Sequence, residues 1–177
     1  MARIYKVENI VASISLKSPI KLIKLKKLPN TQYNPEQFPG LVLRLQDMHV
    51  TFLVFGSGKL VCTGGRSRED IITAMGKLLK ELRKVGINIK SEWKLEIQNI
   101  VASGNLNKKL DLNKIAFNVD ETEYNPEQFP GLVYKLPNSK ITFLLFGTGK
   151  IVCTGAKNVS EIDGAIKTLL SAIKKVN

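Results

Sequence analysis

The sequence contains few residues that could bind a metal ion or form a disulfide. Among 177 residues there are two cysteines and one histidine. Cys62 and Cys153 lie in matching segments, LVCTG and IVCTG, far apart in the chain. Two distant cysteines and one histidine do not make a zinc site at the usual ligand spacing. We therefore expect both thiols to be small core side chains, and we expect no metal or cofactor.

Long apolar runs are also missing. No segment approaches the roughly 20 apolar residues needed to span a bilayer. The N-terminal residues MARIYK lack the apolar region of a signal peptide. These absences predict a soluble protein that stays in the cell, while an apolar share of 44% is enough for a globular core.

Acidic residues are few relative to basic ones. The chain has 27 Lys and Arg against 15 Asp and Glu, a formal net charge of +12 and a sequence pI of about 9.7. The excess is uneven, because residues 1–90 carry 16 basic against 6 acidic side chains and residues 91–177 carry 11 against 9. Such a balance favours a polyanionic partner, which could be DNA, RNA or an acidic membrane surface.

What the sequence does have is an internal repeat. YNPEQFPGLV occurs at residues 33–42 and again at 124–133, and TFLVFGSGKLVCTG recurs as TFLLFGTGKIVCTG. One residue was inserted or deleted between Ser13 and Tyr33, since the offset between the copies changes there from 90 to 91. Two copies of this length are too few for a solenoid and indicate a pseudo-two-fold molecule that presents one surface twice. The predicted repeats are residues 1–90 and 91–177.

Each repeat is predicted to form several short antiparallel strands and a long C-terminal helix, which is an α+β layer with helices on one side of a sheet. Pro-Gly and Gly-rich turns separate the strands, and Ser67 and Asn158 are expected to cap the long helices. The predicted strands are 5–15, 41–45, 50–55 and 59–63, then 95–104, 132–136, 141–146 and 150–154, with short helices near 20–25 and 112–117. The apolar stripes of the long helices are Ile71, Ile72, Met75, Leu78, Leu79 and Leu82, and Ile162, Ala165, Ile166, Leu169, Leu170 and Ile173.

One face of the predicted sheet lacks the charged residues that a solvent-facing sheet surface should carry. Strand alternation places residues such as Phe52 and Cys62 on the side that the helices cover. The opposite side is uncharged and partly apolar in both repeats. We interpret it as a binding surface, although burial of both faces in a three-layer fold also fits the pattern. Its residues are Asn9, Val11, Ser13, Thr51, Leu53, Phe55, Val61 and Thr63, and Asn99, Val101, Ser103, Thr142, Leu144, Phe146, Val152 and Thr154.

The residue types of this face suit the floor of the DNA minor groove. A·T pairs offer only acceptors there, and a G·C pair adds the guanine amino group. Asn and Thr can donate to the acceptors, whereas Val and Leu fill space that the amino group would invade. Basic or hydroxyl side chains at strand ends would meet the phosphates. The predicted phosphate contacts are Arg44, Ser57, Lys59, Arg66, Lys135, Thr148, Lys150 and Lys157.

Two pairs of phenylalanines flank the same face. Phe38 and Phe55 in the first repeat correspond to Phe129 and Phe146 in the second. Each pair joins a loop residue before Pro-Gly to a strand-end residue before a Gly-rich turn. A phenylalanine is usually a core residue, and that interpretation stays open here. Apolar wedges at the ends of a minor-groove surface can also enter base steps and kink the duplex, which is the function we predict for these rings.

The paired QNIVAS-like, YxPEQFPGL and SGKxVxTGAK-like segments resemble the TATA-box-binding protein family over about residues 4–175, and YNPEQFPGLV is similar to the archaeal branch. The resemblance implies a saddle, with a curved ten-stranded antiparallel sheet and four helices on its convex face. It implies a non-enzymatic general transcription initiation factor that binds the TATA box through the minor groove. That factor would act in the cytoplasm or nucleoid of an archaeon, or in the nucleus of a eukaryote. The implied base and groove contacts are Asn9, Val11, Leu53, Val61, Thr63, Asn99, Val101, Leu144, Val152 and Thr154.

The resemblance also implies protein partners. The second-repeat loop 124–130 corresponds to the segment that docks the transcription factor B family, and the assembly recruits RNA polymerase. Asn125 replaces an acidic residue found in many relatives. The positive charge is unusual among archaeal relatives, so we expect a steep salt dependence of DNA binding. The implied partner-binding residues are Tyr124, Asn125, Glu127 and Gln128.

Two rival functions compete with this one. GSGK and GTGK resemble part of a phosphate-binding loop, but Leu60 and Ile151 follow where that loop needs Ser or Thr and a helix. No paired carboxylates recur on the uncharged face, and His49 is expected to be a turn residue, so catalysis is not indicated. The alternative is a module of the same fold that binds nucleic acid or protein without promoter-specific bending. Retention of all four phenylalanines and both asparagines favours promoter binding.

Overall fold

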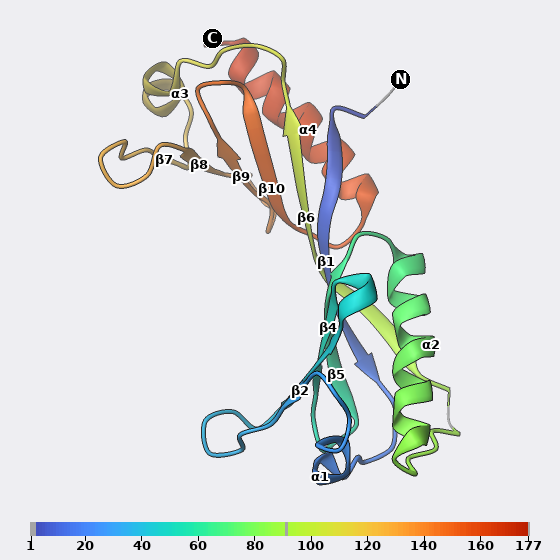
Figure 1. Ribbon diagram of the computed structural model, residues 1–177. Helices are drawn as coiled ribbons and strands as arrows, with labels where there is room; N and C mark the ends of the chain where they lie inside the picture. Colours follow the sequence, from blue (N-terminus) through green and yellow to red (C-terminus); the bar gives the residue numbers. More distant parts are fainter. Residues whose placement is uncertain (1–2, 91, 177) are drawn as a thin grey trace. The chain divides into compact units, whose positions relative to one another are not determined.

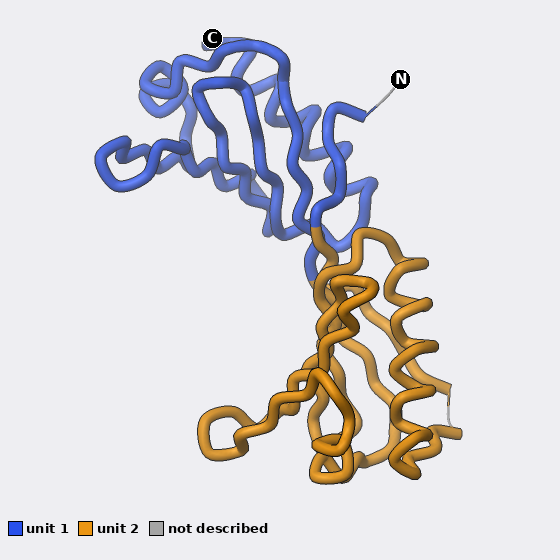
Figure 2. The backbone as a smooth tube through the Cα atoms, viewed as in Figure 1, with its two compact units in different colours: residues 1–8, 99–177 blue, residues 9–98 orange. Residues whose placement is uncertain are grey.

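The computed structural model describes residues 3–90 and 92–176, and the chain divides into two compact units (Figure 2). Unit 1 comprises Met1–Glu8 and Asn99–Asn177, and unit 2 comprises Asn9–Gln98. The first residues of the chain therefore belong to the unit that the second repeat forms. The predicted boundary at residue 91 lies outside the described residues and stays a prediction.

The part of the chain that the structure describes has ten strands and four α-helices, as predicted (Figure 1). The strand order is β2-β3-β4-β5-β1-β6-β10-β9-β8-β7, and within each unit neighbouring strands pair antiparallel. The first repeat contains β1 (Tyr5–Ser15), α1 (Leu22–Leu25), β2 (Thr31–Gln32), β3 (Leu41–Leu45), the 3-10 helix η1 (Gln46–Met48), β4 (Val50–Val54), β5 (Lys59–Gly65) and α2 (Arg68–Lys84). The second contains β6 (Lys94–Asn105), α3 (Leu112–Asn118), β7 (Thr122–Glu123), β8 (Leu132–Lys135), β9 (Thr142–Leu145), β10 (Lys150–Ala156) and α4 (Val159–Lys174).

The core of each unit lies between one long helix and one face of its strands. In unit 2 the helix α2 contacts β5, and in unit 1 α4 contacts β10. Phe52 and its counterpart Phe143 are fully buried, as are the cysteines Cys62 and Cys153 next to them in the sheet. Both thiols are free, as predicted. The helix-covered face predicted by strand alternation is confirmed.

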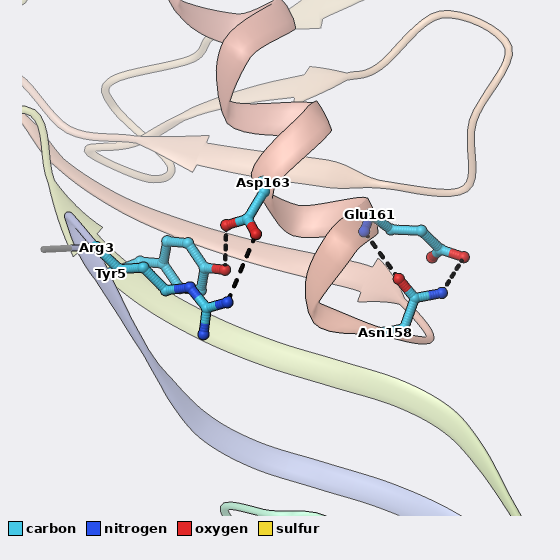
Figure 3. A network of polar contacts seen from close by, with 5 residues as sticks. All are labelled: Arg3, Tyr5, Asn158, Glu161 and Asp163. Carbon is cyan, nitrogen blue, oxygen red and sulfur yellow. Dashed lines mark hydrogen bonds and ion pairs between the residues drawn. The ribbon is translucent and has the colours of Figure 1, made fainter. Parts of the chain in front are cut away.

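Both long helices begin at the predicted caps. Ser67 Oγ accepts a hydrogen bond from the Asp70 backbone N–H (3.0 Å). Asn158 Oδ1 accepts one from the Glu161 N–H (2.9 Å), as Figure 3 shows. The acidic side chains reach back in turn, Asp70 to the Arg66 N–H and Glu161 to the Lys157 N–H. The cap bonds satisfy N–H groups that the first helical turn leaves without a partner, and the return bonds hold the residue that precedes each cap.

The start of the chain is fastened to α4 in unit 1. Tyr5 donates a hydrogen bond from its hydroxyl to Asp163 (2.6 Å), and the Arg3 guanidinium lies 3.6 Å from the same carboxylate (Figure 3). Burial raises the pKa of Tyr5 to about 12, and the bond to Asp163 acts in the same direction.

Several predicted details need correction. Ile72 and Leu170 do not belong to the buried stripes, since 46% and 37% of their surfaces are exposed. The buried stripe of α2 is centred on Ile71, Met75 and Leu78, so the residue that follows Ile71 falls at its margin. β4 ends at Val54 because Phe55 already belongs to the turn that closes on Lys59.

The inserted residue lies in the α3 segment. Thr31 and Thr122 donate equivalent hydrogen bonds to the carbonyls of Leu28 and Val119, so the offset is already 91 there. The extra length falls in the last turn of α3, where Phe117 is 90% exposed.

Candidate nucleic-acid interface

The helix-free side of the strands is open in both units. Its side chains are half-buried, while their neighbours along each strand are buried. The alternative that both faces are buried is therefore wrong for these residues. We call them the open face: Asn9, Val11, Ser13, Thr51, Leu53, Phe55, Val61 and Thr63 in unit 2, and Asn99, Val101, Ser103, Thr142, Leu144, Phe146, Val152 and Thr154 in unit 1.

Strand pairing aligns the predicted groove residues in rows. In unit 2, Leu53 lies opposite Val61, and Val61 lies opposite Ser13 on the next strand. In unit 1, Leu144 lies opposite Val152, which in turn lies opposite Ser103. Each row is a short apolar strip ending in a hydroxyl group, and the two units repeat it.

Each unit holds one asparagine of the open face in a fixed orientation. In unit 2, the Gly64 N–H donates to Asn9 Oδ1 (2.7 Å), and Asn9 Nδ2 donates to Thr63 Oγ1 (3.1 Å). Because the carbonyl oxygen accepts from the backbone, the amide NH₂ must point along the face. One of its two hydrogens bonds the threonine, so the other can donate to a ligand.

Unit 1 repeats the arrangement. The Gly155 N–H donates to Asn99 Oδ1 (2.7 Å), and Asn99 Nδ2 donates to Thr154 Oγ1 (3.1 Å). The asparagines and threonines were predicted from the sequence, but the two glycines that orient them were not. The repeated Cys-Thr-Gly segments were the available signal.

The phenylalanine pairs predicted from sequence do come together. The rings of Phe38 and Phe55 meet edge to face with centroids 5.8 Å apart, and those of Phe129 and Phe146 do so at 5.9 Å. Phe38 and Phe129 remain about two-fifths exposed, at 39% and 41%. Because the loop ring of each pair is exposed at the sheet surface and its strand-end partner is only half-buried, the interpretation of these rings as core residues is wrong.

A second pair of glycines makes room for these rings. A Cβ on Gly40 would lie 2.7 Å from Phe38 Cε1 and 3.0 Å from Phe55 Cε1, and Gly131 has the same relation to its rings. The loops that carry Phe38 and Phe129 are closed by hydrogen bonds from their N–H groups to the Asn34 and Asn125 carbonyls (both 3.0 Å). The Pro-Gly segments thus place each loop ring against its strand-end partner.

The predicted phosphate contacts are all exposed: Arg44, Ser57, Lys59, Arg66, Lys135, Thr148, Lys150 and Lys157. Arg44 and Lys135 lie opposite Thr51 and Thr142 in the sheet, on the side of the open face. Lys135 also forms an ion pair with Glu123 (3.0 Å).

The predicted partner loop projects from unit 1 between β7 and β8 (Figure 1). Asn125, Glu127 and Gln128 are exposed, while Tyr124 is half-buried. The matching loop of unit 2 has the same exposure pattern, so geometry alone does not distinguish the two loops.

The remaining chemically active side chains include the two thiols and the single histidine. Burial raises the pKa of the Cys62 thiol to about 12 and that of Cys153 to about 11. His49 is an exposed left-handed residue after η1, as expected of a turn. Across the described residues, His, Cys, Asp and Glu side chains nowhere gather in a group that could hold a metal ion. Within that same part of the chain, no helix has the length and apolarity to cross a bilayer.

These features define a class: duplicated α+β proteins whose antiparallel strands carry helices on one side and leave the other side open. A sequence model of the family described as "Transcription factor TFIID (or TATA-binding protein, TBP)" matches residues 4–85 and again residues 94–176. The chain belongs to the TATA-binding protein family. It is accordingly a transcription factor and not an enzyme.

Archaeal proteins are among its relatives. It is 52% identical to the TATA-box-binding protein of Methanosphaera stadtmanae, covering 88% of this chain and 86% of that protein. It is 43% identical to that of Pyrobaculum calidifontis, covering 97% and 87%. The solved structure of Methanococcus jannaschii TBP superimposes with a TM-score of 0.92 at 44% identity, covering 97% of this chain and 99% of that one.

Proposed function

We propose that this protein is a general transcription initiation factor that binds the TATA box of promoters by laying its open face in the minor groove. The observation that carries the proposal is the doubled open face, with one oriented asparagine per unit and a phenylalanine pair beside it. Membership of a family of TATA-box-binding proteins supports it. Such a factor acts inside the cell, where promoters are.

Base selection follows from the chemistry of the open face. The minor-groove edge of an A·T pair carries acceptors only, to which the amide groups of Asn9 and Asn99 can donate. The hydroxyls of Thr63 and Thr154 donate to the asparagine oxygens (3.3 and 3.4 Å) and help to hold those amides in place. Valine and leucine rows provide close apolar contact where a guanine amino group would have to be desolvated without a partner. A·T-rich sites are therefore favoured over G·C-rich ones.

Kinking is the function we assign to the phenylalanine pairs. Inserting an apolar ring between base pairs unstacks one step, which costs a few kcal/mol, and the resulting bend brings more DNA into contact with the protein. TA steps deform easily, so the sequence is selected partly by its flexibility. The basic side chains around the face would hold the phosphates of the bent duplex.

DNA bending tests this proposal. We expect the wild-type protein to bend a TATA duplex in a circular-permutation assay, and Phe38→Ala combined with Phe129→Ala to reduce the bend. Phe117→Ala is the matched control, because that ring is exposed but lies on α3. Wild-type protein that binds DNA without bending it would favour the alternative, a nucleic-acid-binding module that does not bend promoters.

We further propose that loop 124–130 docks a transcription factor B family protein, which then recruits RNA polymerase. The support is the exposure of Asn125, Glu127 and Gln128 and the family relationship. The two identical YNPEQFPGLV loops provide the test. Glu127→Lys should abolish formation of the ternary complex with DNA and the factor, whereas Glu36→Lys, the same change in the other loop, should leave it intact. Equal effects of both changes would refute the assignment.

A further inference from the structure

The residues of the open face are identical in the two units, but the residues that precede its asparagines are not. Glu8 precedes Asn9, and Gln98 precedes Asn99. In unit 1 the Ser103 hydroxyl donates to Glu8 Oε1 at 2.6 Å, and in unit 2 Gln98 Nε2 donates to Ser13 Oγ at 2.8 Å. Repeat symmetry thus preserves the contact between the two side chains but reverses the direction of the hydrogen bond.

The reversal changes what each half offers to a base. In unit 2, Ser13 accepts, so its own hydroxyl hydrogen and the second Gln98 amide hydrogen can both donate to a ligand. In unit 1, Ser103 uses its only hydrogen to reach a carboxylate. The pair in unit 1 therefore presents a carboxylate and the Ser103 lone pairs, which are acceptors, and no hydroxyl donor.

Glu8 lies on the surface that would face DNA. It lines a hollow of about 1050 Å³ in unit 1, together with Ser103, Val152 and Phe146 of the open face. Lys6 lies 3.3 Å from the Glu8 carboxylate, which lowers the cost of holding a negative charge there. In unit 2 the equivalent of Lys6 is Glu96, which pairs with Lys94 (3.2 Å), and the position of Glu8 is taken by the neutral amide of Gln98.

We propose that Glu8 and Ser103 form a subsite for the exocyclic amino group of a guanine. That group is the only hydrogen-bond donor in the minor groove, and the Glu8 carboxylate beside Ser103 is an acceptor that has no counterpart in unit 2, where Gln98 takes its position. The half of the box under unit 1 would then tolerate one G·C pair, whereas the half under unit 2 would accept only A·T pairs. The proposal rests on the proposed minor-groove binding and names a specificity determinant within it.

The test uses 2,6-diaminopurine, which pairs with thymine and adds the minor-groove amino group to adenine. A palindromic A·T duplex is prepared unmodified, with one diaminopurine in one half, or with one in each half, and the position is scanned along the half-site. Dissociation constants are compared with each protein's own value for the unmodified duplex. A palindrome lets the protein turn to place either unit on the modified half.

At one position of the scan, wild type should bind the singly modified duplex within about twofold of the unmodified one. It should lose about tenfold on the doubly modified duplex, as expected for one unmatched groove contact. Glu8→Gln should lose about tenfold on the singly modified duplex. Gln98→Glu, the matched change in unit 2, should tolerate both modified duplexes.

The outcomes separate this inference from the proposed function. If wild type does not bind the unmodified duplex, minor-groove binding itself is wrong. If wild type binds it but Glu8→Gln gains or loses affinity equally on all three duplexes, Glu8 acts only through its charge, and the subsite is refuted. Loss of tolerance in Glu8→Gln with normal binding of the unmodified duplex supports the subsite.

Discussion

Among single residues, two glycines set the direction of the donors on the open face. Gly64 and Gly155 have φ angles of +102° and +100°, which L-residues with a Cβ rarely adopt. A Cβ on Gly64 would lie 2.1 Å from the His49 carbonyl oxygen, and one on Gly155 would lie 2.2 Å from that of Lys140. The backbone N–H groups of the same glycines hold Asn9 and Asn99. Any other residue at these two positions would displace the strand whose backbone N–H group holds the asparagine.

Replacement of Gly64 should therefore damage both stability and DNA binding. We expect Gly64→Ala to lower the free energy of unfolding by more than about 1 kcal/mol, because the new methyl group meets backbone atoms that cannot rotate away. Urea denaturation measures the first effect. Affinity for a TATA duplex at a temperature where the variant is still folded measures the second.

Gly76→Ala is the matched control. Gly76 lies in α2, and no atom comes within 4 Å of the place that an alanine methyl group would take, so alanine fits the helical conformation there. This change should raise the free energy of unfolding by about 0.5–1 kcal/mol. A Gly64→Ala protein as stable as wild type would show that the strand gives way at no cost.

The buried thiols predict a loss of stability in alkali. Burial raises the pKa of Cys62 to about 12 and of Cys153 to about 11, from an ordinary value of 9.0. Below pH 9 the two thiols keep their protons in both the folded and the unfolded chain. Between pH 9 and 11 the unfolded chain loses protons that the folded chain retains, so the free energy of unfolding falls as pH rises. Urea titrations at about pH 8 and about pH 10.5 should show this decrease.

The double variant Cys62→Ala, Cys153→Ala isolates the contribution of the thiols. It should be less stable at every pH because two core side chains become smaller, but its stability should fall less steeply between about pH 8 and 10.5. Tyr5, whose pKa is also raised, remains in the variant and accounts for part of the residual slope. An unchanged slope would exclude the thiols as its cause.

Strand alternation was enough to predict which residues form the open face. The period of two fixes the side on which Val61 or Thr63 lies once Leu60 and Cys62 are known to be buried. The contacts between distant residues were not predictable in this way. The clash partner of Gly64 is His49, and the partner of Glu8 is Ser103; both depend on strand pairing, which local sequence does not determine.

At the scale of elements, the long helices are stabilised at their first turns by their own sequence. Ser67 and Asn158 are the caps predicted from the sequence, and each closes reciprocal bonds with the acidic residue three positions later. The acidic partners also lie at the positive end of the helix dipole. These caps belong to the helices that cover the core, on the side of the strands opposite the open face.

Removing one cap should therefore change stability without changing DNA recognition. Ser67→Ala should lower the free energy of unfolding by about 1 kcal/mol, because the Asp70 N–H loses its acceptor. Thr73 is an exposed position inside α2. Thr73→Ala should raise the free energy of unfolding by no more than roughly a few tenths of a kcal/mol, because alanine has the higher helix propensity. Chemical denaturation measures both, and affinity for a TATA duplex should be unaffected in each.

The elements that the sequence did not reveal are the shortest ones. β2 and β7 have two residues each, too few for any periodicity, and exist because they pair with β3 and β8. The resemblance to a known family supplied the strand total that periodicity could not. The margins of the helix stripes at Ile72 and Leu170 were wrong for a related reason, since the width of a stripe depends on the surface packed against it.

At the scale of the whole molecule, charge sets the salt dependence of DNA binding. The net charge of +12 and the exposed basic residues around the open face predict many released counterions. Each neutralised phosphate contributes a slope of about −0.9 to a plot of log K against log salt concentration.

Single substitutions can count these contacts. Lys59→Ala or Lys150→Ala should make the slope shallower by about 1. Lys80→Ala on α2 removes the same charge away from the open face and should leave the slope nearly unchanged. Fluorescence anisotropy over a salt range of roughly 50 to 300 mM measures the slopes. A wild-type slope equal to that of an uncharged relative would contradict the prediction that the basic side chains around the open face contact phosphates.

The assignment of Met1–Glu8 to unit 1 and of residues up to Gln98 to unit 2 has a consequence for how such a chain could have arisen. Each repeat gives the opening residues of its long first strand to the compact unit built by the other repeat. None of the described residues of these exchanged segments is buried in the core, so two half-length subunits could each keep a complete core while trading the first residues of their long strands. Duplication of the gene would join two such swapped subunits in one chain.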